Sequence, residues 1–297
     1  MNNFIKVTDS SYPSLLKQIY KPPEKMYFNG DVGILGGNLI AFVGTRDFTP
    51  YGKYCVERII SELSLCDFVI VSGLARGIDT FAHQAALKNG LKTVAVLGTG
   101  INNVYPRENE GLAEEIVSSG GCILSEYEGD GPGRKFTFPM RNRIIAGLCV
   151  ATVVVEAPES SGALITAKRA NEENRDVFAI PGDIDRAESA GCNKLIQGSA
   201  ACPVMSGMDI IRALKMQPEL IKTENDAFDA DSGLGDLNLG EQNLKVLNTI
   251  SKTRPIFIDD LVERSGVSLV EANKTLSMLE INGLVQSSDN GFYLRCF

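Results

Sequence analysis

The chain has 297 residues, of which 44% are hydrophobic, enough for one large domain with its own core and a smaller second unit. Its net charge of -8 argues against a protein that coats nucleic acid through its overall field, so any nucleic-acid surface must be a local one. No apolar run is long enough to span a bilayer, and the first ten residues lack a signal-peptide pattern, so we expect a cytoplasmic protein without membrane contact.

Residues 1–36 mix short apolar groups with prolines and glycines and predict a small N-terminal arm lying on the main domain. Apolar strands and helices of 3.6-residue period then alternate through residues 37–216. The predicted strands are Leu39–Val43, Phe68–Ser72, Thr93–Leu97, Cys122–Ser125, Ala151–Val155 and Val177–Ile180. The predicted helices are Tyr51–Leu65, Gly77–Asn89, Glu108–Ser119, Asn142–Leu148 and Ala163–Asn174, with an irregular segment before Asn142.

These strands are continuous apolar runs, as a mostly parallel sheet covered by helices on both faces requires. The fold class is therefore α/β, a doubly wound and Rossmann-like domain, with ligands expected beyond the carboxyl ends of the strands.

Residues 217–240 hold six acidic residues against one lysine and few large apolar groups, which predicts an acidic linker. Residues 241–297 follow with three helical periods, Asn243–Ile250, Ile258–Ser265 and Ser268–Asn282, and a hairpin around Asp289–Gly291. Three helices and a hairpin of this length predict a small winged-helix domain.

Small-residue turns follow four of the predicted strands. Their backbone amides are open to phosphate, and three cations, Arg46, Arg76 and Lys168, lie close to them in sequence. The turn residues that we select are Gly44, Thr45, Gly73, Ser161 and Gly162. Taken singly, such turns serve more often only to reverse the chain. No G-x-G-x-x-G follows the first strand, so we expect no dinucleotide or other cofactor.

The segment Gly133–Ile144 carries four basic residues, no acidic residue and two phenylalanines. Basic groups bind phosphate oxygens, and an exposed ring can stack on an unpaired base, so the composition suits single-stranded nucleic acid. The alternative, equally weighted from the segment alone, is that the rings face the core and the cations are solvated or paired.

Catalytic and metal-binding patterns are absent from the sequence. The only histidine, His83, has no adjacent nucleophile, and a packing role is favoured over catalysis. The seven cysteines form no C-x-x-C pair, which favours reduced and packed thiols over disulfides or a zinc site. We therefore expect no catalytic residue and no metal.

Several runs, in order and at sensible spacing over about residues 39–210, resemble the bacterial DNA-processing protein A (DprA or Smf) family. The runs are Val43-Gly-Thr-Arg46, Ser72-Gly-Leu-Ala-Arg-Gly-Ile-Asp79, Ala95-Val-Leu-Gly98 with Tyr105-Pro106, Phe138-Pro-Met-Arg-Asn-Arg-Ile-Ile-Ala-Gly-Leu148, Ser161-Gly162, Val177-Phe-Ala-Ile-Pro-Gly182 and Gly191-Cys-Asn-Lys-Leu-Ile196. The Arg-Asn-Arg-Ile-Ile-Ala-Gly run is highly specific.

The resemblance implies a homodimeric protein, not an enzyme, that binds single-stranded DNA and passes it to a RecA-type recombinase, chiefly in natural transformation. By motif match, the phosphate-holding arginine falls on Arg46, the gripping lysine on Lys135 and the stacking ring on Phe138, with Arg143 in the same pocket. The DNA-binding residues expected in all are Arg46, Lys135, Phe138, Arg143, Gly44, Thr45, Gly73, Arg76, Arg141, Ser161, Gly162 and Lys168.

Two other function classes remain open. The lysine-decarboxylase-like nucleotide phosphoribohydrolases share this architecture, but their catalytic carboxylate would fall on Ile165, which disfavours hydrolysis. A winged-helix transcription regulator is the other, and the predicted third helix, Ser268–Glu280, disfavours it because Lys274 is its only cation.

Overall fold

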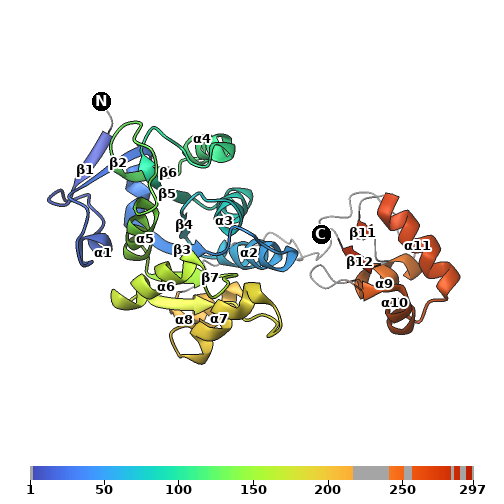
Figure 1. Ribbon diagram of the computed structural model, residues 1–297. Helices are drawn as coiled ribbons and strands as arrows, with labels where there is room; N and C mark the ends of the chain where they lie inside the picture. Colours follow the sequence, from blue (N-terminus) through green and yellow to red (C-terminus); the bar gives the residue numbers. More distant parts are fainter. Residues whose placement is uncertain (1–2, 217–240, 251–255, 282–283, 288–291, 296–297) are drawn as a thin grey trace. The chain divides into compact units, whose positions relative to one another are not determined.

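A computed structural model describes residues 3–216, 241–250, 256–281, 284–287 and 292–295 of the chain (Figure 1). The chain divides into two compact units, Met1–Leu220 and Ile221–Phe297. Each unit has its own buried apolar core. The acidic linker expected at residues 217–240 lies outside the described residues.

One nine-stranded sheet organises the first unit, in the order β1-β2-β6-β5-β4-β3-β7-β8-β9. All its neighbouring strands are parallel except for the pairs β1–β2 and β2–β6. The strands are β1 (Asn3–Lys6), β2 (Lys25–Gly30), β3 (Asn38–Val43), β4 (Phe68–Ser72), β5 (Thr93–Gly100), β6 (Cys122–Tyr127), β7 (Ala151–Val154), β8 (Asp176–Ala179) and β9 (Cys202–Pro203). The predicted doubly wound, mostly parallel sheet is confirmed.

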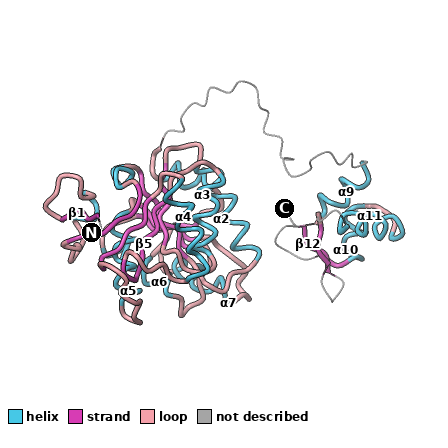
Figure 2. The backbone as a smooth tube through the Cα atoms, turned by 90° about the horizontal axis from the view of Figure 1, so that it is seen from above, coloured by secondary structure: helices cyan, strands magenta, loops and turns pink. Residues whose placement is uncertain are grey.

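Helices cover both faces of this sheet (Figures 1 and 2). The core against one face includes residues of α2, α3 and α8, with α4 over the neighbouring strands, and the core against the other includes residues of α1, α5, α6 and α7. The helices are α1 (Ser14–Lys17), α2 (Pro50–Leu63), α3 (Ile78–Lys88), α4 (Glu110–Ser118), α5 (Thr137–Leu148), α6 (Gly162–Glu172), α7 (Ala187–Gln197) and α8 (Gly207–Ala213), with 3-10 turns η1 (Val32–Gly36) and η2 (Arg107–Asn109).

The strand order reverses between β3 and β7. From β3 the chain moves through β4 and β5 to β6, then crosses back by α5 to place β7 on the other side of β3. Strands on either side of such a switch point send their following loops in opposite directions, which leaves a crevice at their carboxyl ends. The loops after β3 and β7 are therefore expected to enclose a ligand site.

Two of the sheet's strands come from the first 36 residues. β2 pairs with β6, and β1 pairs with β2 at the edge of the sheet. The segment expected as an arm on the main domain thus adds hydrogen-bonded strands to it, while Leu16 of α1 is fully buried in its core.

The segment before Asn142, expected to be irregular, is helical from Thr137 onward. Pro139 is the third residue of this helix, α5, where the backbone N–H has no intrahelical acceptor and its loss costs little. The earlier start places Phe138, Arg141 and Arg143 on one helix, which packs against β5 and α6.

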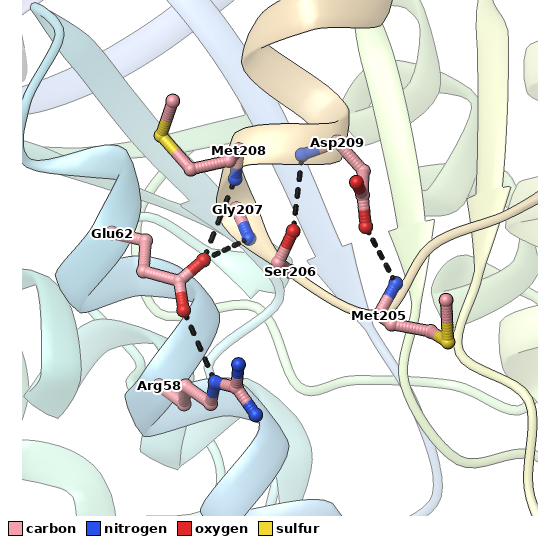
Figure 3. Close-up of polar contacts among 7 residues, drawn as sticks. All are labelled: Arg58, Glu62, Met205, Ser206, Gly207, Met208 and Asp209. Atoms are coloured by element: carbon pink, nitrogen blue, oxygen red, sulfur yellow. Dashed lines mark hydrogen bonds and ion pairs between the residues drawn. The ribbon is translucent and has the colours of Figure 1, made fainter.

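The last helix of this unit, α8, is fastened to the end of α2 (Figure 3). The Glu62 carboxylate accepts hydrogen bonds from the backbone N–H groups of Gly207 at 2.6 Å and Met208 at 3.4 Å. Arg58 donates to the other oxygen of Glu62 at 3.1 Å. The backbone N–H groups of Gly207 and Met208 at the α8 N-terminus are therefore satisfied by a carboxylate of the same chain.

The second unit has the elements of a winged helix, as predicted. Its helices are α9 (Glu241–Thr249), α10 (Ile258–Ser265) and α11 (Leu269–Ile281). Its strands are β10 (Ile256–Phe257), β11 (Val285–Ser287) and β12 (Phe292–Arg295), in the sheet order β10-β12-β11. The turn expected at Asp289–Gly291 lies outside the described residues.

The six cysteines that the structure describes are free thiols, and all except Cys202 are buried. None of the described helices combines the length and the apolar character needed to cross a membrane.

Candidate nucleic-acid interface

A cavity of about 910 Å³ lies at the carboxyl ends of the strands around the switch point. Residues 43–47 line it from the end of β3. The loop after β7 and the start of α6 contribute Pro158, Ser160–Ala163, Ile165 and Thr166. The rest of the wall comes from residues 132–135, from one side of α5, from the turn after β4 and the start of α3 (Ala75 and Asp79), and from the end of β5 and the loop after it (Thr99, Asn103, Tyr105 and Arg107). Turns that are far apart in the sequence thus meet at one edge of the sheet, where phosphate-accessible amides were expected.

Four exposed basic side chains line this cavity, Arg46, Arg107, Arg134 and Lys135, and we call them the rim cations. In the part of the chain that the structure describes, none of them forms a salt bridge. The cavity wall holds two carboxylates, Asp47 and Asp79. A positive surface with unpaired guanidinium and ammonium groups attracts phosphate.

Below the rim, Arg141 and Asp79 also line the cavity but are 94% and 92% buried, and we call them the floor residues. Arg141 donates to the carbonyl oxygens of Gly73, at 2.7 Å, and Val96. Asp79 accepts from the backbone N–H groups of Gly73 at 3.1 Å and Ala75 at 3.4 Å. The floor residues therefore hold the turn after β4 in place.

Gly73 explains how a guanidinium fits at this position. A Cβ atom on residue 73 would lie 2.5 Å from the Arg141 guanidinium carbon, so only glycine leaves room for it. Burial lowers the pKa of Arg141 to about 10, although Asp79 opposes this change, and burial raises the pKa of Asp79, although Arg141 opposes that. Each of the two charges thus stabilises the charged form of the other.

The small-residue turns supply neutral donors to the same cavity. Ser161 caps α6 by accepting a hydrogen bond from the N–H of Ala163 at 3.2 Å, and the start of this 11-residue helix lines the cavity. Thr45 is held by backbone hydrogen bonds to Glu156 at 2.7 Å and from Ile78 at 3.2 Å. The rigid turns fix the positions from which Arg46 and the α6 amides face the cavity.

Eight of the twelve residues predicted from the sequence line this cavity. They are Gly44, Thr45, Arg46, Lys135, Phe138, Arg141, Ser161 and Gly162. The other four, Gly73, Arg76, Arg143 and Lys168, are not part of its wall.

The three cations outside the wall each have a carboxylate partner. Arg76 pairs with Glu108, and Lys168 lies 3.9 Å from Glu172. Arg143 pairs with Glu126 and also donates to the carbonyl oxygen of Lys21 at 2.9 Å, with only 12% of its side chain exposed. These three side chains therefore fasten the fold or lie on the outer surface, whereas the rim cations have no such partner.

The two phenylalanines of the basic segment differ in position. Phe138 is half-buried in the cavity wall, and a Cβ atom on Gly98 would come within 2.7 Å of its ring. Phe136 is 59% exposed and lies outside the wall, with the Arg134 guanidinium carbon 5.9 Å from its ring centre. The ring expected to stack on a base is thus the one set into the cavity.

The lining residues that the sequence did not predict include one exposed aromatic side chain, Tyr105, and two exposed cations, Arg107 and Arg134. Arg134 lies in the basic segment, next to the predicted Lys135. Tyr105 and Arg107 follow the third predicted strand, so their place in a strand-end loop was a usable signal.

No catalytic arrangement accompanies this cavity among the described residues. His83 is fully buried and contacts the Thr93 hydroxyl at 2.7 Å, and burial and the Arg141 charge lower its pKa to about 3, so the ring is neutral at pH 7. Ile165, at the position of the hydrolases' carboxylate, lines the cavity as an exposed apolar side chain. The described residues include no group of three or more His, Cys, Asp and Glu side chains that could hold a metal ion.

Two helices of the second unit, α10 and α11, carry a net negative charge. α10 has three acidic residues and one arginine, and α11 has Glu271 and Glu280 against Lys274. Leu269 and Val270, at the start of α11, are 49% and 79% exposed. A helix of this composition lacks the cations that bind duplex phosphates.

The sequence matches two family models. Residues 3–215 match the family described as DNA recombination-mediator protein A, and residues 236–291 match the DprA winged helix domain. The DNA processing protein DprA of Streptococcus pneumoniae is 48% identical over 208 residues, 69% of this chain and 72% of that protein. The protein Smf of Synechocystis is 36% identical over 321 residues, 98% of this chain and 80% of that protein.

Solved structures agree with this assignment. The crystal structure of DNA processing protein A from S. pneumoniae superposes with a TM-score of 0.68 at 45% identity, covering 71% of this chain and 74% of that one. A structure of DNA processing protein A from Helicobacter pylori, which concerns the single-stranded DNA binding mode of that protein, gives a TM-score of 0.64 at 29% identity and covers 72% and 98%. The chain belongs to the DNA recombination-mediator protein A family.

Proposed function

We propose that the strand-end cavity binds single-stranded DNA, with the rim cations on the phosphates and Phe138 against a base. The observation that supports this most strongly is the rim itself, four exposed cations without a salt bridge among the described residues, in a chain of net charge -8. The relative from H. pylori binds single-stranded DNA, which supports the same ligand here.

Single strands fit this wall better than duplex. In a duplex the base faces are stacked inside the helix, so a ring in a cavity wall cannot reach them, whereas an unpaired base can turn toward it. The amides of α6 and the guanidinium groups of the rim read phosphate and not sequence. We infer binding that tolerates any sequence.

Of the residues expected to bind DNA, the proposal assigns direct phosphate contact to Arg46 and Lys135, and it adds Arg107 and Arg134. Gly44, Thr45, Ser161 and Gly162 shape the wall, while Gly73 and Arg141 hold it from below. Arg76, Arg143 and Lys168 are assigned at most a minor share, because each is already paired with a carboxylate.

The family description as a recombination mediator supports a further step, in which the bound strand is protected and passed to a RecA-type recombinase. We propose that the chain does this as a homodimer and without catalysing a reaction on the DNA. Single-turnover loading assays with a recombinase on strands covered by a single-strand-binding protein measure this step. Loading that is no faster with this protein than without it would contradict the proposal.

A matched pair of charge reversals tests the DNA site. Arg46→Glu with Lys135→Glu changes two rim cations, and Arg76→Glu with Lys168→Glu makes the same change in net charge outside the cavity wall. We expect the first variant to lose single-strand binding in a gel-shift assay and the second to keep most of it, with both melting near the wild-type temperature. Equal losses would mean that only the overall charge matters, and unchanged binding in the first variant would refute the site.

A further inference from the structure

Tyr105 is an exposed aromatic side chain in the loop after β5. It is 55% exposed, and its hydroxyl forms no hydrogen bond with the residues that the structure describes. Among the described residues its ring contacts one other aromatic ring, that of Phe138, at 5.8 Å between ring centres and an interplanar angle of 47°. Both rings line the strand-end cavity.

Phe138 alone offers a base only part of its ring. A Cβ atom on Gly98 or on Gly133 would come within 2.7 Å of it, so both backbones already lie against this ring. Tyr105 continues the aromatic surface outward from Phe138 into solvent. Exposed tyrosine provides a large, stiff contact area at a low cost in side-chain entropy, which suits it to binding.

The end of β5 and the loop that carries Tyr105 are hydrogen-bonded to the residues that immediately precede the basic segment. The N–H groups of Gly100 and Asn102 donate to the carbonyl oxygens of Gly131 and Gly129, at 2.8 and 3.0 Å. The Thr99 hydroxyl donates to the carbonyl oxygen of Asn103 at 2.5 Å. A ligand that meets this surface therefore finds the loops already placed, which reduces the entropy cost of binding.

Cations lie close to the two rings in the sequence and line the same cavity. Arg107 lies two residues after Tyr105, Lys135 lies three residues before Phe138, and both line the same cavity. A cavity wall that combines aromatic rings with unpaired cations suits a chain that alternates bases and phosphates.

From this arrangement we propose that Tyr105 is a second base-stacking residue, which with Phe138 forms a two-ring platform for unpaired bases. The proposal rests on the proposed function and deepens it, because a platform that needs exposed base faces selects single strands over duplex. Phe136 is the matched comparison. It is as exposed as Tyr105, and it lies near the same basic segment but outside the cavity wall.

The test compares Tyr105→Ala, Tyr105→Phe and Phe136→Ala with the wild type, using two probes of equal length, a thymidine oligonucleotide and its fully abasic counterpart. Both keep the phosphates, and only the first has bases. We expect Tyr105→Ala to weaken binding of the thymidine strand about tenfold and to leave the abasic strand unchanged. Tyr105→Phe and Phe136→Ala should bind both probes as the wild type does.

Each other outcome has a distinct meaning. A Tyr105→Ala variant that binds the thymidine strand with wild-type affinity, or that weakens equally on both probes, would overturn the stacking role. Wild-type protein that binds neither probe would instead refute the proposed function. Thermal melting of each variant, and quenching of 2-aminopurine placed in the strand, separate loss of stacking from loss of fold.

Discussion

The rim and the floor of the strand-end cavity both contain arginine, but the arginines have different roles. Arg141 on the floor is 94% buried and donates to two backbone carbonyls, while Arg46 on the rim is exposed and has no salt bridge among the described residues. A buried cation must be satisfied inside the protein, and an exposed one keeps its charge for a ligand. We expect floor changes to alter stability and rim changes to alter affinity.

The largest effect is expected from Arg141→Met, which leaves two carbonyls without their donor and Asp79 without its neighbouring positive charge. The free energy of unfolding should fall by about 3–5 kcal/mol. Chemical denaturation measures this, with Arg46→Met as the control that should stay within about 0.5 kcal/mol of the wild type. Similar losses of unfolding free energy in the two variants would contradict the distinction between floor and rim residues.

The pH dependence of stability reports on His83, a buried residue whose pKa is affected by the charge of the floor residue Arg141. In the folded chain the pKa of His83 is about 3, below the ordinary value of 6.5. Between these values the unfolded chain binds a proton on His83 and the folded chain does not, so the free energy of unfolding decreases as the pH falls below 6.5. At pH 5 this costs about 2 kcal/mol relative to pH 7. His83→Gln should lose that part of the slope in denaturation curves at the two pH values, and an identical slope in both proteins would show that His83 titrates normally.

Neutralising two rim cations should act on DNA binding alone. In Arg46→Gln with Lys135→Gln, we expect single-strand affinity at 0.1 M salt to fall on the order of 25-fold, and the salt dependence of log Kobs to become shallower by about 1.4. Fluorescence anisotropy over a salt series measures both. A loss of affinity with an unchanged salt slope would point to a distorted site and not to lost phosphate contacts.

A single rim change should give a smaller effect of the same form. Arg107→Gln should weaken binding about fivefold at 0.1 M salt and reduce the slope by about 0.7, whereas Arg76→Gln should change neither. Arg76 lies in the turn after β4 and pairs with Glu108, the residue next to Arg107, so this comparison isolates the contribution of an unpaired cation. An Arg76→Gln effect as large as that of Arg107→Gln would break the assignment.

The smallest effect is expected in the second unit. Lys274 is the only basic residue of the acidic helix α11, so Lys274→Gln should leave single-strand affinity within about twofold of the wild type. A larger loss of affinity in the same anisotropy assay would indicate that the winged-helix domain contributes to DNA binding.

Local sequence patterns predicted the central strands of the sheet but not the edge strand β1 or its neighbour β2. β3 to β8 are buried apolar runs, which the sequence displays directly. β1 has a single buried residue, Ile5, and β2 pairs with a strand about 95 positions later, so neither has a strong local pattern. The start of α5 was missed because Pro139 disfavours helix interiors, although the first turn tolerates it.

Local sequence patterns identified only some of the residues that form the candidate site. Arg46 and Lys135 follow from their motifs, but pairing decides which cations remain available, and pairing is a long-range property. Arg143 meets Glu126 on β6 and a carbonyl oxygen 122 residues away, which no spacing along the chain reveals. In the same way, the contact of Tyr105 with Phe138 exists only in the folded protein.

The most direct measurement is a salt titration of the full chain with single-stranded and double-stranded DNA of the same sequence. If the four rim cations each neutralise one phosphate, log Kobs for the single strand should fall against log salt with a slope of about -3, and the single strand should bind more tightly than the duplex. A slope near zero, or tighter binding of the duplex, would contradict single-strand binding by the rim cations.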